Sequence, residues 1–478
     1  MNFKNSALLV ILSVMACFSC ASKQNEKKEE SVKNKPNILF IAVDDLRPEL
    51  GCYDSTLIKT PHIDKLALQG VTFRNSFCNI PVCGASRASL MTGLRPTRNR
   101  FIIYKARADK QAPSAVVLSQ HFKNHGYYTV ANGKIFHAFE DNAQSWDENW
   151  RLQINDSTYH DYVLEENKIL ESQDSGPAYE RANVPDTAYH EGKTALKTIA
   201  DLKKLKESGK PFFVAAGFVK PHLPFNAPKK YWDLYSPSDF KDKADKFWPE
   251  NAPRKAFMNS GELRSYNGIP KSGPIGNDLE ITLQHAYYAC VSYTDANIGL
   301  LLKALDDLDL RKNTIVVLWG DHGWNLGEHA IWGKHNSFKT ALSAPLVISA
   351  PNMSEGTCTS LTEFIDIYPT LTELCDLPTP SHLEGKSLVN VLKDTKAKHK
   401  DFVISKWKDG LTINTERYAY TEWRKDDDVL LDRMLFDMLK DPNQTKNIAE
   451  QKENKALVDS LQNLLLNNRG SDYFKANY

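Results

Sequence analysis

The chain contains four apolar runs that each end in polar, chemically reactive side chains. Uninterrupted apolar runs of this length are typical of strands that are buried on both faces of a parallel sheet. The runs and the residues that follow them are 37–43 (NILFIAV) before Asp44 and Asp45, 127–132 (YYTVAN) before Lys134 and His137, 211–219 (PFFVAAGFV) before Lys220 and His222, and 314–320 (TIVVLWG) before Asp321 and His322.

Helical patterns lie between these runs, at residues 61–68, 115–124, 187–207 and 279–308. Alternation of buried strands with helices predicts an α/β fold: a doubly wound, mostly parallel sheet flanked by helices. In such sheets, ligands bind beyond the carboxyl ends of the strands. We therefore expect the polar residues after the four runs to converge on one site.

The pattern changes after about residue 385. Short, partly alternating segments at 401–407, 410–423 and 433–439 predict a small antiparallel sheet, and 454–467 has the pattern of an amphipathic helix. These segments predict a large domain over residues 36–385 and a smaller C-terminal subdomain over residues 386–478.

The N-terminus has the pattern of an export signal. Lys4 precedes the apolar run 7–18 (ALLVILSVMACF), which is too short to span a bilayer comfortably. Residues 14–17 (VMAC) resemble a bacterial lipobox, which predicts lipidation of Cys17. Cys20 is a weaker alternative for the lipid, and a signal that is only cleaved is another interpretation.

These features divide the N-terminus into a signal region (1–17) and a charged, flexible tether (18–35). We expect a bacterial membrane lipoprotein on the periplasmic face or the cell surface, or a secreted or periplasmic protein if the signal is only cleaved. No other segment is long and apolar enough to be a membrane helix, so membrane contact is expected only through the lipid anchor.

Composition sets two further limits. The 478 residues are 41% hydrophobic and 25% charged with a net charge of +1, which is typical of a soluble globular protein and gives no indication of nucleic-acid binding. Eight cysteines are present, and the six outside the signal are widely spaced without a CxxC pair. This pattern excludes a dense disulfide framework and a zinc site, and it leaves one or two disulfides open.

Three carboxylates follow two of the apolar runs. Asp44 and Asp45 are adjacent, so they would repel each other unless a cation lay between them. Asp321 follows a second run and supplies a further oxygen. Oxygen-rich sites favour hard cations such as calcium or magnesium. Capping of the following helices is the alternative role for these residues, but three acids at such positions favour a metal site.

Cations and histidines accompany the acids. Arg87, Lys134 and Lys334 would each be a surface residue if taken alone, but together beside a metal they would form a pocket for a tetrahedral oxyanion. His137 and His222 could then divide the proton transfers between a base and an acid.

Cys83 lies at the start of a short helical pattern, with Gly93 as a plausible terminator. The N-terminus of a helix stabilises negative charge, which would activate a thiol placed there. The residues alone leave three roles open for Cys83: a nucleophile, half of a disulfide, or a small buried side chain.

The motif around Cys83 resembles the signature of the type I sulfatases in the alkaline phosphatase superfamily. Residues 83–87 (CGASR) and 90–93 (LMTG) carry this resemblance, and several other segments look like sulfatase counterparts in the expected order. Three of them, DDLRP, KPHLPF and DHGW, are similar to the iduronate-2-sulfatase-like branch. These three stretches lie within longer matching segments, and the full set of segments is NILFIAVDDLRPELGCY, GKIFH, KPHLPFNAPKKY, GDHGWNLGEHAIWGKH and LFDMLKDPNQTKNIA.

This resemblance implies an alkaline-phosphatase-like fold and a set of roles for the matched residues. In the family the cysteine is oxidised to formylglycine by a maturation enzyme, and the aldehyde hydrate attacks sulfur. One calcium ion would be bound by Asp44, Asp45, Asp321, His322 and the modified Cys83. Arg87 and Lys134 would hold the hydrate, and Lys134 and Lys334 the sulfate. His137 would act as the base that releases sulfate, and His222 would protonate the departing sugar oxygen.

Two positions depart from the commoner family pattern. Ala85 stands where proline is more usual, which bears on the choice of maturation enzyme, and His322 replaces an asparagine ligand, as it does in the iduronate-type branch. His335 and Lys220 are further candidates for substrate contact, with exposed surface as the default for each. The rim of the pocket is expected in loops 101–113 and 235–274.

The resemblance implies a polysaccharide-degrading sulfatase that acts on a sulfated poly- or oligosaccharide, either an algal polysaccharide such as ulvan or a glycosaminoglycan uronate 2-O-sulfate. Three alternatives remain at this point: a phosphatase or phosphodiesterase on the same fold, a catalytically silent carbohydrate-binding lipoprotein, and a hydrolase that uses the unmodified thiol of Cys83.

Overall fold

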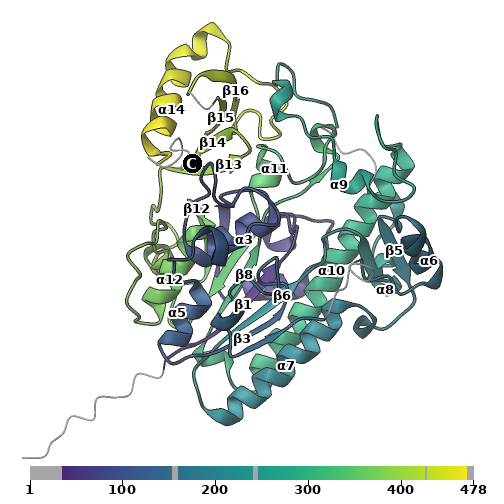
Figure 1. Ribbon diagram of the computed structural model, residues 1–478, viewed down its shortest axis with the longest axis vertical. Coiled ribbons are helices and arrows are strands. Elements are labelled where there is room, and N and C mark those ends of the chain that lie inside the picture. The colour runs from purple at the N-terminus through teal and green to yellow at the C-terminus, as the bar shows by residue number, and fades with distance from the viewer. Residues whose placement is uncertain (1–34, 153–159, 241–245, 426–427, 471–478) are drawn as a thin grey trace, which may run out of the picture. The chain divides into compact units, whose positions relative to one another are not determined.

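The computed structural model describes residues 35–152, 160–240, 246–425 and 428–470. Contacts divide the chain after Lys35, and Pro36–Tyr478 form one compact unit (Figure 1). The expected signal region and nearly all of the expected tether lie outside the described residues. Among the residues that are described, no helix has both the length and the apolar character needed to cross a bilayer.

A sheet of eight strands forms the centre of the compact unit, in the order β12-β2-β11-β8-β1-β6-β3-β4. Every neighbouring pair is parallel except those of β11, which runs antiparallel to both β2 and β8. The mostly parallel sheet is thus confirmed. The strands are β1 (Asn37–Val43), β2 (Val71–Phe77), β3 (Tyr128–Gly133), β4 (Glu148–Trp150), β6 (Phe212–Phe218), β8 (Thr314–Gly320), β11 (Leu346–Ser349) and β12 (Gly356–Glu363).

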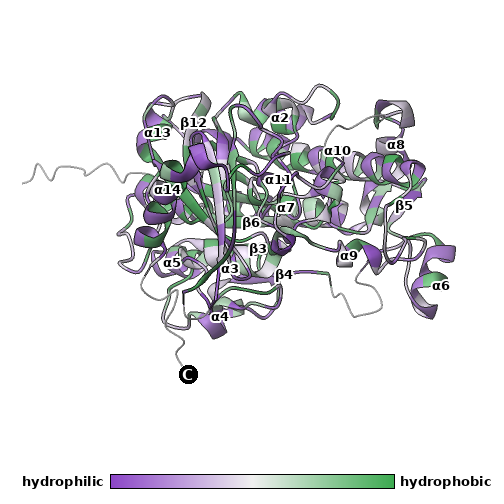
Figure 2. Cartoon of the chain, turned by 90° about the horizontal axis from the view of Figure 1, so that it is seen from above, coloured by the Kyte–Doolittle hydropathy of each residue, from purple (hydrophilic) through white to green (hydrophobic). Residues whose placement is uncertain are grey.

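Alternate side chains of β1 enter two separate hydrophobic layers, which is why its whole sequence is apolar. Leu39 and Ile41 pack with residues of α2 (Pro61–Ala67), α7 (His190–Ser208) and α10 (Asn277–Asp307). Phe40 packs on the other face with residues of α3 (Cys83–Thr92), α5 (Leu118–Asn124) and α12 (Ile367–Leu374). Figure 2 shows the central strands in hydrophobic colour between helices that carry polar surface.

The predicted helices are present with small shifts at their ends. Helix α5 begins at Leu118 rather than at 115, because Val117 is extended. The remaining short elements are α4 (Ala108–Gln111), α6 (Glu165–Gln173), α8 (Lys229–Trp232), α9 (Gly261–Arg264), α11 (Lys339–Leu342), α13 (Val389–Lys393), β5 (Tyr179–Ala182), β7 (Phe225–Pro228), β9 (Asn325–Leu326) and β10 (Trp332–Gly333).

A separate antiparallel sheet lies near the C-terminus, as predicted. Its strands β13 (Phe402–Trp407), β14 (Gly410–Thr415), β15 (Tyr418–Arg424) and β16 (Leu430–Asp437) pair in sequence order. Helix α14 (Lys455–Asn468) packs on this sheet through its own small core. Leu388, Val391 and Leu392 pack in the core of the large sheet, and the domain boundary at residue 385 stays a prediction.

A buried ionic cluster joins the end of β12 to the segment before β13. We call Arg95, Glu363, Asp366, His399 and Lys400 the structural ion cluster. Both oxygens of the Glu363 carboxylate accept hydrogen bonds from Arg95 at 2.5 Å, and Lys400 donates to Glu363 at 2.7 Å and to Asp366 at 2.5 Å. His399 Nε2 lies 3.1 Å from Asp366. All four carboxylate oxygens of this cluster therefore have partners.

Candidate active site

Cys83 is the first residue of α3, a helix in which every residue is buried. Val82 before it is extended, and Gly93 ends the helix with φ of 70°, a conformation that favours glycine. Gly84 is also required by packing, since a Cβ there would lie 1.9 Å from the carbonyl oxygen of Tyr104. The helix start at Cys83 and its end at Gly93 confirm the sequence prediction.

Four predicted ligands come together at the end of β1. Ligand atoms of Asp44, Asp45, Cys83 and His322 all lie within 4.8 Å of one another, and all four residues are buried. The carboxylate of Asp321 lies beside this group, where it accepts hydrogen bonds from the backbone N–H of Asp45 at 3.0 Å and from Arg87 Nε at 2.8 Å. Asp321 thus positions its neighbours in this structure, and its role as a calcium ligand stays a prediction.

The donor set fits a divalent cation. Asp44 Oδ1 and His322 Nε2 are buried without a hydrogen-bond partner. Such atoms are rare in proteins because an unpaired buried polar group is costly, and a metal ion is one group that satisfies them. Burial raises the pKa of Asp44, but the charges of Lys134, His222 and Arg87 outweigh it and hold this pKa well below its usual value. The Asp44 carboxylate is therefore ionised, as a metal ligand would have to be.

Asp45 adopts φ of 59°, which is unusual for a residue other than glycine. Its backbone is held on both sides, because Asp321 accepts from its N–H and the hydroxyl of Tyr287 donates to its carbonyl oxygen at 2.7 Å. This left-handed turn directly after β1 gives Asp44 and Asp45 different orientations, although the two residues are adjacent in the chain.

The three predicted cations are buried rather than exposed. Arg87, Lys134 and Lys334 have 0%, 1% and 2% of their surface accessible, so surface exposure, the default for each alone, is wrong. Buried charges require partners. Lys134 pairs with Asp44, and Lys334 Nζ lies 2.9 Å and 3.1 Å from the two carboxylate oxygens of Asp45. Arg87 Nη2 lies 3.7 Å from Asp44 Oδ1 and makes no hydrogen bond, so its N–H group could donate to an oxyanion.

The two histidines have opposite electrostatic surroundings. Burial and then the charge of Lys134 lower the pKa of His137 to about 2, so His137 is neutral and able to accept a proton. Its Nδ1 is buried without a hydrogen-bond partner. Burial and Lys334 also act to lower the pKa of His222, but Asp45, Glu262 and Asp44 outweigh them and raise it to about 10. His222 is therefore a proton donor.

Cys83 is not an activated thiol in this environment. Burial and the charge of Asp44 raise its pKa, against smaller opposing effects from Lys334 and Lys134. The activation expected from a helix N-terminus is thus wrong, because the side chain has 2% of its surface accessible and the dipole acts against a large desolvation cost. The six described cysteines are all free thiols, so the structure contains no disulfide between Cys83 and another described cysteine.

Sequence reasoning missed Glu262, which contacts His222 from the expected rim of the pocket. Its Oε1 lies 3.0 Å from His222 Nε2, and its Oε2 lies 3.3 Å from Lys334 Nζ. It lies in α9, within the loop region 235–274 that was expected to form the rim, but no motif marks it. Tyr104 from the other expected rim loop places its ring 5.6 Å from that of His137.

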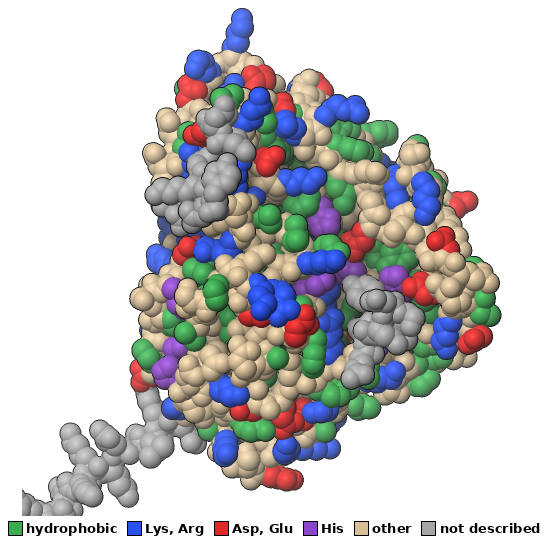
Figure 3. Space-filling model, viewed as in Figure 1, with side chains coloured by type: hydrophobic (Ala, Val, Ile, Leu, Met, Phe, Trp, Pro, Cys, Tyr) green, Lys and Arg blue, Asp and Glu red, His purple; other side chains and the backbone are tan. Residues whose placement is uncertain are grey.

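The two further substrate candidates are not exposed either. Lys220 has 2% of its surface accessible and donates to the carbonyl oxygens of His222 and Pro224, at 3.2 Å and 2.7 Å. Lys220 therefore holds the loop that carries His222. His335 is half-buried and stacks on Trp407 with the ring centroids 5.0 Å apart and an angle of 5° between the planes. Figure 3 shows histidines and basic side chains gathered near the middle of the face drawn.

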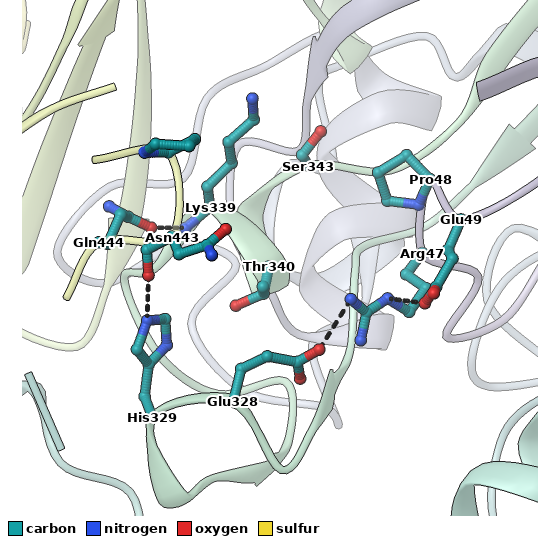
Figure 4. A pocket seen from close by; sticks show the side chains of 11 residues that line it. Arg47, Pro48, Glu49, Glu328, His329, Lys339, Thr340, Ser343, Asn443 and Gln444 are labelled. Atoms are coloured by element: carbon teal, nitrogen blue, oxygen red, sulfur yellow. Dashed lines mark hydrogen bonds and ion pairs between the residues drawn. The ribbon is translucent and has the colours of Figure 1, made fainter. Parts of the chain in front are cut away.

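A cavity of about 440 Å³ lies elsewhere and contains none of the predicted site residues. Figure 4 shows its lining, in which Arg47 pairs with Glu328 and Glu49 and His329 bonds to the carbonyl oxygen of Asn443. Arg47, Glu49 and Glu328 of this cavity thus compensate one another's charge. The candidate metal ligands lie around Cys83 and not in this cavity.

Comparison with known proteins identifies the family of the chain. The profile of the family described as sulfatase matches residues 36–377. The chain belongs to the sulfatase family. A second profile, described as the C-terminal region of N-sulphoglucosamine sulphohydrolase, matches residues 327–471 of this sulfatase. The protein is accordingly a sulfuric ester hydrolase.

Three relatives of this sulfatase match it over three quarters of its length or more. Iduronate 2-sulfatase of Mus musculus is 32% identical over 402 residues, which cover 76% of this chain and 72% of the mouse protein. A protein of Formosa agariphila named sulfatase is 30% identical, and the match covers 98% of this chain and 93% of that protein. An ulvan-active sulfatase of the same organism is 28% identical, with 93% and 83% covered.

Solved structures confirm the fold. A protein in complex with its substrate D-glucosamine-2-N,6-O-disulfate superimposes with a TM-score of 0.72 at 21% identity, covering 93% of this chain and 99% of that chain. A phosphonate monoester hydrolase from Silicibacter pomeroyi gives a TM-score of 0.75 at 20% identity, with 92% and 97% covered. At these identities the likeness concerns the fold alone.

Proposed function

We propose that this sulfatase removes sulfate from a sulfated poly- or oligosaccharide with Cys83 oxidised to formylglycine and one calcium ion bound beside it. The observation that carries the proposal is the buried cluster at the start of α3. There, carboxylate and imidazole atoms without partners surround a cysteine whose thiol is kept protonated. Such a site suits a metal and a modified residue, whereas it disfavours a thiolate nucleophile.

The first roles in the proposed reaction are metal binding and attack on sulfur. Asp44, Asp45 and His322, with Asp321 and residue 83, would hold calcium, which would neutralise negative charge in the site. The hydrated aldehyde at residue 83 would supply the oxygen that attacks sulfur.

The cations hold the charged groups in place. Arg87 and Lys134 orient the hydroxyl groups at residue 83, and Lys134 and Lys334 bind the sulfate oxygens as negative charge develops on them. These residues are already fixed by buried ion pairs with Asp321, Asp44 and Asp45. The site therefore needs little rearrangement when sulfate enters.

Proton transfer follows from the two histidine environments. His137 is neutral, so it would take the proton of the hydroxyl at residue 83 that is not bonded to sulfur, and the aldehyde would re-form as the bond to sulfate breaks. His222 is protonated, so its Nε2 gives a proton to the oxygen of the departing sugar. Glu262 positions His222 through the 3.0 Å contact and favours its charged form.

The substrate class rests on the relatives. Proteins named iduronate 2-sulfatase and ulvan-active sulfatase are both similar to this chain. We infer a sulfated uronate-containing saccharide as the substrate, either a glycosaminoglycan uronate 2-O-sulfate or ulvan. A bacterial lipoprotein anchored through Cys17 or Cys20 would suit polysaccharide degradation, and a formylglycine-generating enzyme is the required partner.

Mass spectrometry of the peptide around Cys83, taken from active protein, tests the modification. We expect the mass of formylglycine, and an unmodified cysteine in fully active protein would overturn the mechanism. Cys83→Ala serves as the blank. Inactivation by thiol-alkylating agents would favour the hydrolase that uses the unmodified thiol.

Paired turnover assays test the reaction class. We expect 4-nitrophenyl sulfate to be hydrolysed faster than 4-nitrophenyl phosphate, and faster phosphate release would favour the phosphatase alternative. Defined sulfated disaccharides then identify the sugar and the sulfate position. No turnover of any of them by protein with confirmed formylglycine would favour the silent carbohydrate-binding alternative.

A further inference from the structure

A second cavity lies between the loop that follows α3 and the antiparallel sheet. Its volume is about 310 Å³, which is within the usual range for small-ligand pockets. Five of its eight lining residues are cations and one is an acid. The lining consists of Arg98, Ile102, Ile103, Lys406, Lys408, Asp409, Arg424 and Lys425.

The cations come from two distant parts of the chain. Arg98 lies in the loop after α3, whereas Lys406 and Lys408 flank Trp407 at the turn between β13 and β14. Arg424, at the end of β15, already pairs with Glu422 at 2.6 Å. Lys408 and Lys425 are exposed, so their charges face solvent. The cavity is therefore positive although the whole chain has a net charge of only +1.

One of these cations is held in an unfavourable environment. Lys406 has 5% of its surface accessible, and its Nζ donates to the carbonyl oxygen of Lys408. Burial lowers the pKa of Lys406 to about 8; the charge of Asp409 acts to raise this pKa, and the charge of Arg98 acts to lower it. An anion in the cavity would offset the effects of burial and of Arg98, because it would stabilise the charged ammonium group.

Residues that line the cavity are chain neighbours of residues that contact the candidate active site. Trp407 stacks on His335, the neighbour of Lys334, which pairs with Asp45. On the other side, Ile103 precedes Tyr104, whose ring contacts that of His137. Successive Cα atoms are about 3.8 Å apart, so the cavity walls begin within one residue of side chains that line the site.

We propose that this cavity is a subsite for a second anionic group of the saccharide, either a further sulfate or a uronate carboxylate, while the reacting sulfate lies at Cys83. The proposal rests on the proposed function and adds to it that the enzyme selects saccharides with more than one negative charge. Steering by local charge explains how a nearly neutral protein recognises a polyanion.

The test compares three disaccharides that carry the same reacting sulfate: one with no other charge, one with an added carboxylate and one with an added sulfate. In the double variant Lys408→Gln and Lys425→Gln, we expect kcat/KM for one or both doubly charged substrates to fall roughly threefold to tenfold relative to the singly charged one. The affected substrate identifies the second anion. The difference is expected to shrink at high salt.

Two further variants sharpen the test. Asp409→Asn removes the single lining acid, and we expect it to raise the preference for doubly charged substrates. Lys452→Gln removes an exposed lysine of the C-terminal region outside the cavity, and we expect it to leave all three rates unchanged. Equal losses on the three substrates, or no loss, would overturn the subsite.

A binding measurement separates this proposal from the proposed function. The Cys83→Ala protein, which needs no turnover, is titrated with the same disaccharides by calorimetry, with and without the two lysine substitutions. Weaker binding of the doubly charged sugars alone supports the subsite whatever the reaction is. Failure of the wild-type protein to hydrolyse any sulfate, by contrast, contradicts the proposed function.

Discussion

Two buried ionic clusters in this molecule look alike in composition but differ in how completely their atoms are paired. The structural ion cluster places Glu363 and Asp366 against Arg95 and Lys400, and all four carboxylate oxygens have partners. At the cluster around Cys83, Asp44 Oδ1, Arg87 Nη2 and His322 Nε2 make no hydrogen bond, and their ion-pair distances are 3.6–3.7 Å. Complete pairing is what stability requires, and incomplete pairing marks where the chain binds other groups.

The largest expected effect is on catalysis and comes from Asp45→Asn. This change removes a predicted metal ligand and the partner of Lys334, and we expect kcat/KM for a sulfate ester to fall at least about a thousandfold. A variant that keeps more than a tenth of the activity would contradict the assignment of Asp45.

The second effect is on stability and comes from Glu363→Gln. Arg95 and Lys400 would lose their charged partner, and breaking a buried pair in this way costs about 3–5 kcal/mol of unfolding free energy. Chemical denaturation measures this loss, while the activity of each folded molecule is expected to stay near the wild-type level. Strong inactivation without destabilisation would place Glu363 in the catalytic machinery instead.

The third effect separates the clusters by their need for a metal. Dialysis against a chelator is expected to abolish activity and lower the melting temperature, and added calcium should restore both. Ligand at one hundred times its Kd stabilises a protein by about 2.7 kcal/mol. The chelator should not change the melting temperature of Asp45→Asn, which serves as the control. Unchanged activity after complete metal removal would reject the calcium site.

The smallest effect comes from Glu262→Gln, at the rim of the site. Glu262 positions His222, so its loss should weaken protonation of the leaving oxygen. We expect kcat to fall about tenfold for a sugar sulfate and much less for 4-nitrophenyl sulfate, whose leaving group needs little protonation. Melting curves of both proteins control for folding. Equal losses on the two substrates would mean that Glu262 acts on sulfate binding and not through His222.

Much of the fold was predictable where the pattern was simple. Strands β1 and β8 were predicted at their observed ends, because uninterrupted apolar runs stop abruptly at Asp44 and Asp321. Strands β2 and β12 were not predicted, because polar residues such as Arg74 and Thr359 interrupt their sequences. Strand β11 is only four residues long.

The site was predictable where residues follow strands or lie in a recognisable motif. Those positions include Asp44, Cys83 and His322, which the fold brings together. Glu262 could not be found in this way, because it reaches His222 from a short helix in a long loop. The raised pKa of Cys83 could not be predicted from the sequence either. The sequence indicates that Cys83 begins a helix, but it does not show how deeply the side chain is buried.

The near-complete burial of Cys83 has a consequence for the proposed modification. With 2% of its surface accessible on a fully buried helix, the side chain cannot be reached by another enzyme once α3 has packed. If Cys83 is oxidised as proposed, the oxidation would have to precede folding, and the two processes would compete in time. A chain that folded first would then be a stable molecule without its reactive group, and the yield of working enzyme would depend on the relative rates of oxidation and folding.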